Sequence, residues 1–174
     1  MKFLLALLTI VTLSLSEDIY EDDISAPDAL SLAKSGEAII VDVRTPIEFL
    51  YVGHGEGFIN IPYLDWTYEP KSIKTRVKSA MIELKTDKIK KHKDVQKLYN
   101  PKERENKKFV SEIMEAMKLS KATKVILVCR SGPRSKAAAN ALTKEGIEAY
   151  NLDEGFIYGW KVKSDAWGGQ WGGQ

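Results

Sequence analysis

The chain has 174 residues, of which 44% are hydrophobic and 29% charged, enough for one domain with a buried core. Its single cysteine, Cys129, excludes an intramolecular disulfide, and only two histidines, His54 and His92, argue against a zinc site. The formal net charge is +2, but residues 71–108 hold 14 Lys and Arg against 5 Asp and Glu. We expect a solvated helical face there; an acidic partner, or a field that attracts small anions, is the alternative.

The first 16 residues have the three parts of a signal peptide. Lys2 is a short basic head, residues 3–15 are mostly apolar, and Ser14 and Ser16 are small residues at the positions that a signal peptidase reads. The apolar stretch is shorter than the roughly 20 residues of a membrane span. We therefore expect export to the periplasm with no stable membrane insertion after cleavage, rather than a buried N-terminal helix or an uncleaved anchor. Nucleic acid is not an expected partner of an exported protein.

Strands and helices alternate on either side of a long connection. In the first part, Ser25 is placed to cap a helix that carries Pro27 in its first turn and ends at Gly36. The β-branched run at 38–43 is typical of a strand buried on both faces. The other expected elements are a helix from Pro46 to Gly53, strands at 58–61, 125–128 and 148–152, and helices at 135–144 and 156–162. This alternation predicts an α/β fold with a parallel sheet covered on both faces.

The connection from 64 to 124 has apolar spacing of its own. Two helix faces are expected, one with Ile73, Val77, Met81 and Leu84, the other with Phe109 or Val110, Ile113 and Met117. Residues 87–106 between them are Lys-rich and weakly periodic, so we expect a loop or a marginal helix. The predicted organisation is a signal peptide at 1–16, one domain at 17–166 with a basic, partly helical insertion at about 65–124, and a flexible tail at 167–174.

The only cysteine lies at the turn between an expected strand and an expected helix. Because the carboxyl ends of parallel strands face the ligand crevice, Cys129 is placed where a reactive group would be. Unpaired N–H groups at the start of the helix near Ser135 favour an anion, and in an empty site that anion is the thiolate. With Arg130 and Arg134 close by, the thiol pKa is expected to fall from about 8.5 into the range of roughly 3.5–7.5. An inert buried cysteine is the alternative.

Three motifs carry a resemblance to a known family. The segment CRSGPRS, residues 129–135, resembles the active-site loop of rhodanese domains, sulfurtransferases that carry sulfur as a cysteine persulfide. The segments IIVDVRTPIEFLYVGHGEGFINIP (39–62) and YNLDEGFIYGW (150–160) are similar to two further motifs of this family, in the family's order. The resemblance covers about 25–160 outside the basic connection. It implies a three-layer α/β/α fold with a central, mostly parallel sheet.

Several positions depart from the family pattern. Gly55 and Glu56 stand where Ile-Pro is usual, Phe58 replaces a small residue, and Glu154 occupies the place of the first glycine of the closing motif. The connection before 124 is also longer than is common in the family. These departures leave the cysteine loop untouched but can reshape the rim of the pocket, so they bear on the identity of the substrate.

The length and charge of the loop suggest the reaction. Four residues separate Cys129 from Arg134, one fewer than in the related phosphatases, and this tighter cradle suits a single terminal sulfur better than a phosphate. With Arg130 and Arg134, this loop resembles the basic loops of rhodaneses that use thiosulfate. The resemblance therefore implies a sulfurtransferase that moves sulfur from an anionic donor such as thiosulfate, through a Cys129 persulfide, to a thiol, a protein thiol or cyanide. A persulfide carrier, or an interaction module with little turnover on free thiosulfate, is the alternative.

The same resemblance assigns roles to the loop. Cys129 is the expected nucleophile, and Arg130 and Arg134 are expected to steady the donor and the leaving anion. The residues expected to shape the loop are Ser131, Gly132, Pro133 and Ser135. No metal and no organic cofactor is implied.

Three more residues are expected to support the loop from outside. Asp42 is expected either to bond to loop N–H groups or, with Arg44, to form only a salt bridge between a helix and a strand. For His54 we favour a structural hydrogen bond over acid–base chemistry. Trp160 is expected to be a lid of the core rather than a platform for substrate.

Overall fold

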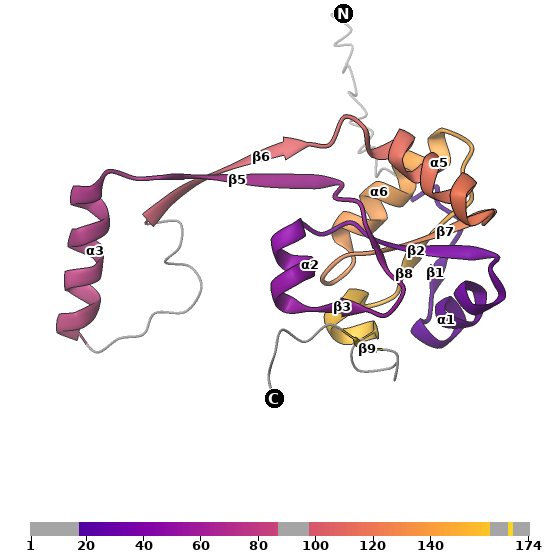
Figure 1. Cartoon of the computed structure of the whole chain (residues 1–174), viewed down its shortest axis with the longest axis horizontal. Helices are drawn as coiled ribbons and strands as arrows, with labels where there is room; N and C mark the ends of the chain where they lie inside the picture. The colour runs from indigo at the N-terminus through magenta and orange to yellow at the C-terminus, as the bar shows by residue number, and fades with distance from the viewer. Residues whose placement is uncertain (1–17, 87–97, 161–166, 169–174) are drawn as a thin grey trace, which may run out of the picture.

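The computed structural model describes residues 18–86, 98–160 and 167–168, and its centre is a parallel five-stranded sheet (Figure 1). The strands lie in the order β1 (Asp23–Ile24), β8 (Ala149–Leu152), β7 (Lys124–Val128), β2 (Ala38–Asp42) and β4 (Ile59–Asn60). Every neighbouring pair is parallel, and Asp42 is in register with Val128. The two central strands therefore end side by side, and Cys129 follows one of them directly.

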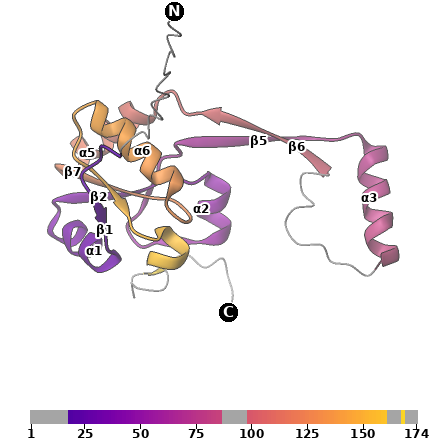
Figure 2. The same cartoon turned by 180° about the vertical axis from the view of Figure 1, so that it is seen from behind.

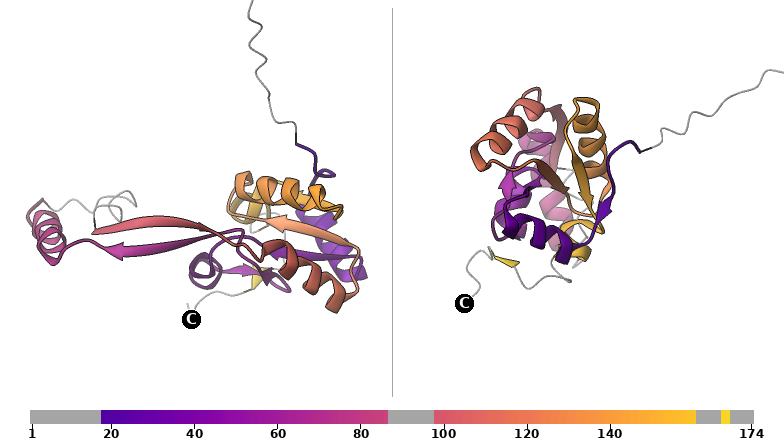
Figure 3. Two further views of the ribbon diagram at one scale, coloured as in Figure 1. Left: turned by 90° about the horizontal axis from the view of Figure 1, so that it is seen from above. Right: turned by 90° about the vertical axis from the view of Figure 1, so that its right-hand side faces the viewer.

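Each face of the sheet has its own core, because side chains alternate along the strands. On one face, Val41 and Leu127 pack with α5 (Phe109–Ser120) and α6 (Pro133–Lys144). On the other, Ile40 and Ile126 pack with α1 (Ala26–Ser35) and the π-helical segment η2 (Gly155–Trp160). Helices thus lie on both sides of the sheet (Figure 3, right), and the expected three-layer α/β/α fold is confirmed.

Local sequence signals set the ends of the helices. Ser25 caps α1 by accepting a hydrogen bond from the Asp28 N–H, and Gly36 ends it at φ +80°, a conformation that favours glycine. α2 (Pro46–Val52) begins with a capping box, in which the Thr45 side chain accepts from the Glu48 N–H and the Glu48 carboxylate accepts from the Thr45 N–H. The positions expected for these helices are confirmed.

An arm leaves the body between β4 and α5. Strands β5 (Leu64–Pro70) and β6 (Tyr99–Glu105) pair antiparallel along their whole length, and α3 (Ile73–Thr86) lies at the far end of this hairpin. Figures 1 and 2 show the arm standing clear of the sheet and its helices from both sides. We use "the arm" for residues 64–105 and "the body" for the rest of the described chain.

The arm corrects the expectations for the long connection. The helix through Ile73, Val77 and Met81 is present, but the expected loop or marginal helix is wrong for 99–105, which form β6. Residues 87–97 lie outside the described part. The second expected helix is α5, whose Phe109 and Ile113 are buried in the core of the body. The sequence analysis missed the hairpin. In β5, Leu64, Trp66 and Tyr68 alternate with polar residues, which was an available signal for a strand, whereas β6 is mostly polar and charged and shows no such alternation.

Short strands were also missed. β1, β3 (His54–Gly55) and β9 (Trp167–Gly168) have two residues each, too few to show a period in the sequence. β9 pairs with β3, so the first two residues of the expected flexible tail belong to a strand. Residues 169–174 and the expected signal peptide lie outside the described part. In the part that is described, no helix is long and apolar enough to cross a membrane.

Candidate active site

The thiol of Cys129 lies at the start of a tight turn between β7 and α6. The residue is 1% exposed and directly follows the last residue of the strand. The next three residues form the turn, and Gly132 at its end has φ +111°, which only glycine adopts without strain. Pro133 then begins α6, where its missing N–H costs nothing. The sulfur is thus placed at the N-terminus of a twelve-residue helix.

Hydrogen-bond donors surround the sulfur. The Gly132 N–H lies 3.1 Å from Sγ and the Ser135 hydroxyl 3.3 Å. The Ser135 hydroxyl is also 2.8 Å from the Gly132 carbonyl oxygen, and its single hydrogen can serve only one of the two at a time. Burial by itself raises the pKa of the thiol, but the Ser135 hydroxyl and the N–H groups of Ser135, Ser131 and Gly132 outweigh it and lower the pKa of Cys129 below its ordinary value. The geometry favours a thiolate.

Arg134 turns toward helix α2. Its two terminal nitrogens donate to the two carboxylate oxygens of Glu48, each at 2.7 Å, in a paired arrangement that suits a guanidinium. Burial by itself raises the pKa of Glu48. The hydrogen bonds and charge of Arg134 and the Thr45 N–H outweigh burial, so the pKa of Glu48 lies below its ordinary value. The hydrogen bonds that Arg134 donates to Glu48 in turn raise the pKa of Arg134, with a smaller contribution from the charge of Cys129. The expected role of Arg134 toward a donor stays a prediction.

Glu48 is the residue of this site that the sequence analysis missed. It joins the first helix turn of α2 to the cysteine loop, because the carboxylate that completes the capping box also accepts from Arg134. The segment Thr-Pro-Ile-Glu at 45–48 carries the capping-box pattern, which was the available signal for its position. The link to Arg134, 86 residues away, is a tertiary contact that no local pattern contains.

Arg130 and Ser131 form the exposed outer side of the loop. Arg130 keeps its place through its carbonyl oxygen, which accepts from the Ile157 N–H at 3.2 Å. The Cys129 carbonyl oxygen accepts from the Phe156 N–H at 2.7 Å. The segment η2 therefore holds the backbone of the loop from behind and leaves the Arg130 side chain exposed to solvent.

Gly155 permits this close approach. A Cβ atom at this position would lie 2.7 Å from the backbone of Arg130 and of Ser131, and the residue has φ +64°. Glu154, directly before it, also has a positive φ of +57°, where a family member would carry glycine. The closing motif of the sequence thus has a physical reason, since it brings η2 against the cysteine loop.

Asp42 and Arg44 form a buried ion pair. Their side chains are 0% and 1% exposed, and Arg44 Nε lies 2.9 Å from Asp42 Oδ1 while Nη2 donates to Oδ2 at 2.5 Å. The guanidinium also donates to the Gly53 carbonyl oxygen at 2.8 Å and lies over the Phe156 ring at 4.3 Å. Asp42 thus forms the expected salt bridge, but with a residue of the turn after β2 and not of a helix, and the contacts join the end of β2 to η2, which holds the loop.

His54 and Trp160 make structural contacts. The His54 ring stacks on Phe49 with centroids 3.8 Å apart, and Nδ1 lies 3.2 Å from the Phe49 carbonyl oxygen. Trp160 is 0% exposed and meets the Phe58 ring edge-on at 4.6 Å. A Cβ on Gly55 would lie 2.6 Å from the Trp160 indole nitrogen and closer still to the Phe58 ring. The unusual Gly55 and Phe58 therefore form a compensating pair, in which the missing side chain makes room for the larger ring.

A groove of about 520 Å³ adjoins the loop on the side of the arm. Arg134 and Glu48 form one wall, Ile47 of α2 the next, and Trp66 and Tyr68 of β5 the opposite wall. Within the described ranges, no group of three or more His, Cys, Asp or Glu side chains is arranged to hold a metal ion.

The family model of the rhodanese-like domain matches residues 25–162. Among solved structures, Rv0390 from M. tuberculosis shares 23% identity with a TM-score of 0.56, over 86% of this chain and 98% of that chain, which shows a common fold. The human single-domain sulfurtransferase TSTD1 (19% identity, TM-score 0.42, 82% and 97% covered) and a rhodanese-related protein from Thermoplasma volcanium (20%, 0.44, 82% and 93%) are more distant. The comparison with curated proteins finds no significant match.

Proposed function

Because the chain belongs to the rhodanese-like domain family, whose general chemistry is sulfur transfer, we propose that it is a thiosulfate-type sulfurtransferase acting through Cys129. One observation carries the proposal. The sulfur of Cys129 is buried at a helix N-terminus, within reach of the Gly132 N–H and the Ser135 hydroxyl, and its pKa is lowered. A thiol whose pKa is lowered, in a ring of donors that can hold a second sulfur, suits persulfide chemistry.

In the first half-reaction, the Cys129 thiolate attacks the outer sulfur of thiosulfate. A bond forms between Sγ and that sulfur, the sulfur–sulfur bond of the donor breaks, and its electron pair leaves with sulfite. The charge of the resulting persulfide stays within the ring of N–H donors. The exposed Arg130 is placed to attract the dianionic donor, while Arg134, bound to Glu48, holds the loop against α2.

In the second half-reaction, an acceptor takes the outer sulfur. Cyanide or a thiolate attacks it, the bond to Sγ breaks, and the electron pair returns to Cys129 as a thiolate. The products are thiocyanate or a new persulfide, and no oxidant or reductant is consumed. The enzyme therefore alternates between two covalent states, which is a ping-pong mechanism.

We also propose that this reaction takes place outside the cytoplasm, in the periplasm. The support is the signal-peptide pattern of the first 16 residues. Fractionation of cells that produce the full chain, with N-terminal sequencing of the product, tests this directly. A periplasmic product that begins near Glu17 is expected, and a cytoplasmic product that retains Met1 would contradict export.

The intact mass after incubation with thiosulfate tests the chemistry. We expect one added sulfur atom on the wild-type chain and none on Cys129→Ser, with steady turnover of thiosulfate and cyanide in the wild type. Loading without turnover would instead favour a persulfide carrier. If no donor adds sulfur to the wild type, the transfer chemistry is wrong and only an interaction module remains.

A further inference from the structure

Helix α3 presents an apolar stripe that nothing in the described chain covers. Ile73, Val77 and Met81 are four residues apart and therefore lie along one face, and they are 66%, 52% and 49% exposed. The hairpin holds this helix away from the body in both views of the arm (Figures 1 and 2). An isolated exposed apolar residue is ordinary, but a continuous stripe on a projecting helix marks an interaction surface.

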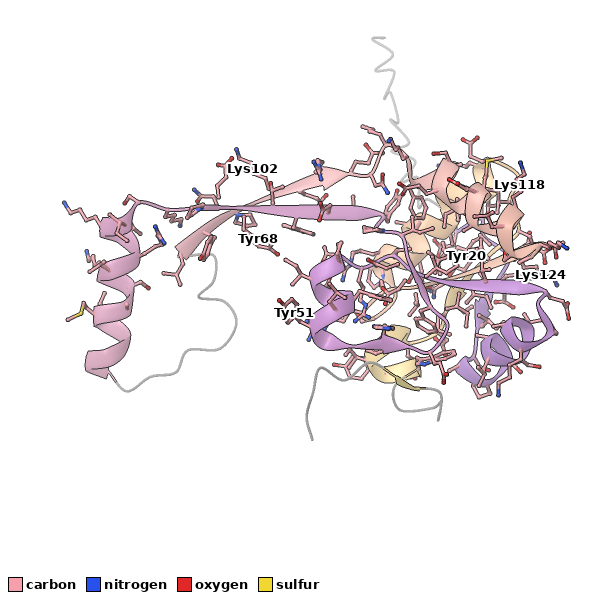
Figure 4. All side chains as sticks on the ribbon, in the orientation of Figure 1. Tyr20, Tyr51, Tyr68, Lys102, Lys118 and Lys124 are labelled. Carbon is pink, nitrogen blue, oxygen red and sulfur yellow. The ribbon has the colours of Figure 1, made fainter. Side chains whose placement is uncertain are left out.

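Helix α2 presents a second apolar surface, next to the cysteine loop. Ile47, Leu50 and Tyr51 are 58%, 50% and 68% exposed, and no residue of this helix is buried. α2 and α3 lie on the same side of the hairpin (Figure 1), and Tyr51 of α2 and Tyr68 of β5 both point into the space between them (Figure 4). A partner that contacts α3 from this side can also reach α2.

The groove beside the loop lies between α2 and the hairpin and reaches Arg134. Its walls contain Ile47 of α2 and Tyr68 of β5, and also Arg134 of the cysteine loop. We call the exposed side chains of α2, Tyr68 and the apolar stripe of α3 the docking surface. One part of it lies at the tip of the arm, and the other lies beside the ion pair that joins Arg134 to Glu48.

The charge of the arm indicates the chemistry of the partner. Along the hairpin, cations are neutralised across the strands, with Lys102 paired to Glu69 and Arg104 to Asp65. Residues 71–86 at the tip, by contrast, contain five basic residues and one acidic one. Lys74 and Arg76 lie at the N-terminal end of α3, where the helix dipole makes positive charge unfavourable. Arg76 has a structural contact, since its Nε donates to the Lys71 carbonyl oxygen at 3.1 Å, but Lys74 and Lys78 are exposed and available for binding.

From these features we infer that the docking surface binds an acidic protein partner with apolar side chains, and that this partner supplies the acceptor thiol. The inference rests on the proposed function. The thiol of the partner loses its proton to solvent, its thiolate attacks the outer sulfur of the Cys129 persulfide, and Cys129 leaves as a thiolate. A lipid surface can meet a basic amphipathic helix as well, but it offers no thiol and does not account for a groove that ends at the cysteine loop.

Two peptides of equal length test the partner chemistry. Each carries one cysteine and the same leucines, and one has glutamates where the other has lysines. The protein is loaded with thiosulfate, and the second-order rate of sulfur transfer to each peptide is measured with cyanide turnover in parallel. We expect the acidic peptide to react faster, and its rate to fall as salt is raised.

The variant Lys74→Glu/Lys78→Glu is expected to slow transfer to the acidic peptide roughly tenfold and to leave cyanide turnover within about twofold. Val77→Asp removes the apolar contact and is expected to act in the same direction. The control is Lys118→Glu, a single charge reversal on α5, at the opposite end of the molecule (Figure 4), and it is compared with the single variant Lys74→Glu. It is expected to change neither rate.

The outcomes separate the two proposals. Failure of wild-type loading overturns the proposed function itself. Normal loading and cyanide turnover, with equal peptide rates in the α3 variants and in Lys118→Glu, overturns the docking surface. Binding to phosphatidylglycerol vesicles that the α3 variants lose, without a change in peptide rate, assigns the helix to a membrane and overturns the inference. A wild-type dimer that the same variants dissociate, again without a change in peptide rate, assigns it to a second copy.

Discussion

Helices α5 and α3 show how differently the two parts of this molecule are built. Both have apolar residues at helical spacing, yet Ile113 of α5 is 0% exposed and Ile73 of α3 is 66% exposed. In the body the apolar face covers a sheet, so burial stabilises the helix. In the arm, the hairpin pairs its own backbone, and neither core cluster of the described chain contains a residue of α3. Apolar spacing therefore predicts a helix but not what covers it.

The largest expected difference between the body and the arm is in the effect of truncating one isoleucine in each. Ile113→Ala is expected to lower the free energy of unfolding by about 2–5 kcal/mol, because it leaves a cavity in the core of the body. Ile73→Ala is expected to change it by less than about 0.5 kcal/mol. Urea unfolding followed by circular dichroism measures both. Equal losses would show that the body and the arm are stabilised in the same way.

Packing around Gly55 is expected to show a somewhat smaller effect. Gly55→Ala places a methyl group against Phe58 and Trp160, and overpacking of this kind costs about 1–3 kcal/mol. In a Phe58→Ala background the same change is expected to cost less, because the ring that it would meet is gone. A double-mutant cycle by thermal or urea unfolding measures the coupling. Additive losses would contradict the compensating pair.

The next prediction concerns the hydrogen bond that the buried Ser135 hydroxyl donates to the Cys129 sulfur. Ser135→Ala removes a hydrogen bond to Sγ and is expected to raise the pKa of Cys129, so less thiolate is present at neutral pH. Because the pKa is lowered in the folded state, its contribution to stability is present above the pKa of the unfolded thiol. That contribution is lost as the pH falls through the folded value.

Ultraviolet absorbance of the thiolate measures this pKa cleanly, since Cys129 is the only cysteine and Cys129→Ser is the blank. Ser131→Ala is the matched control, because it keeps the backbone N–H that faces the sulfur. An unchanged titration in Ser135→Ala would contradict the proposed role of its hydroxyl.

A small gain in stability is expected at the closing motif. Glu154 has φ +57°, which a residue with a side chain adopts at a cost. Glu154→Gly removes that cost but adds freedom to the unfolded chain, and the net effect is a gain of about 0.5 kcal/mol. Differential scanning calorimetry checks it. A loss of stability would mean that the contacts of the Glu154 side chain exceed its backbone strain.

The smallest effect is expected from removing the arm. Asp65 and Arg104 are paired across the hairpin, so deletion of 66–103 with an Asn-Gly turn between them closes the chain without reaching the body. The stability of the body is expected to stay within about 0.5 kcal/mol and loading with thiosulfate to remain. Calorimetry and intact mass measure these. A shortened chain that does not fold would contradict the prediction that the body is stable without the arm.

Strong local patterns made most of the body predictable. The continuous apolar runs at 38–43 and 125–128, and the start and end signals at Ser25 and Gly36, place the sheet and α1 correctly because burial and capping act locally. The two-residue strands and the hairpin escaped. Pairing over two residues leaves no period. In the hairpin, the alternation of Leu64, Trp66 and Tyr68 with polar residues was available in β5 but was not used, and β6 has no such pattern.

At the site, the sequence placed the cysteine at the turn but not its surroundings. The position of Cys129 between a strand and a helix followed from the hydrophobic run and the loop motif. The ion pair between Arg134 and Glu48 and the support of the loop by η2 could not be predicted from the sequence, because they join segments far apart in the chain.

The amino-acid sequence by itself determined the alternation of strands and helices, the family and the cysteine at the head of a helix, because all of these depend on residues close together in the chain. The tertiary structure alone decided which arginine is bound and which exposed, how Gly55 and Phe58 share one space, and that α3 faces solvent at the end of a hairpin. The reason is physical: hydrogen bonds and packing between distant segments depend on where the fold brings those segments together. The local sequence around each residue does not specify these contacts.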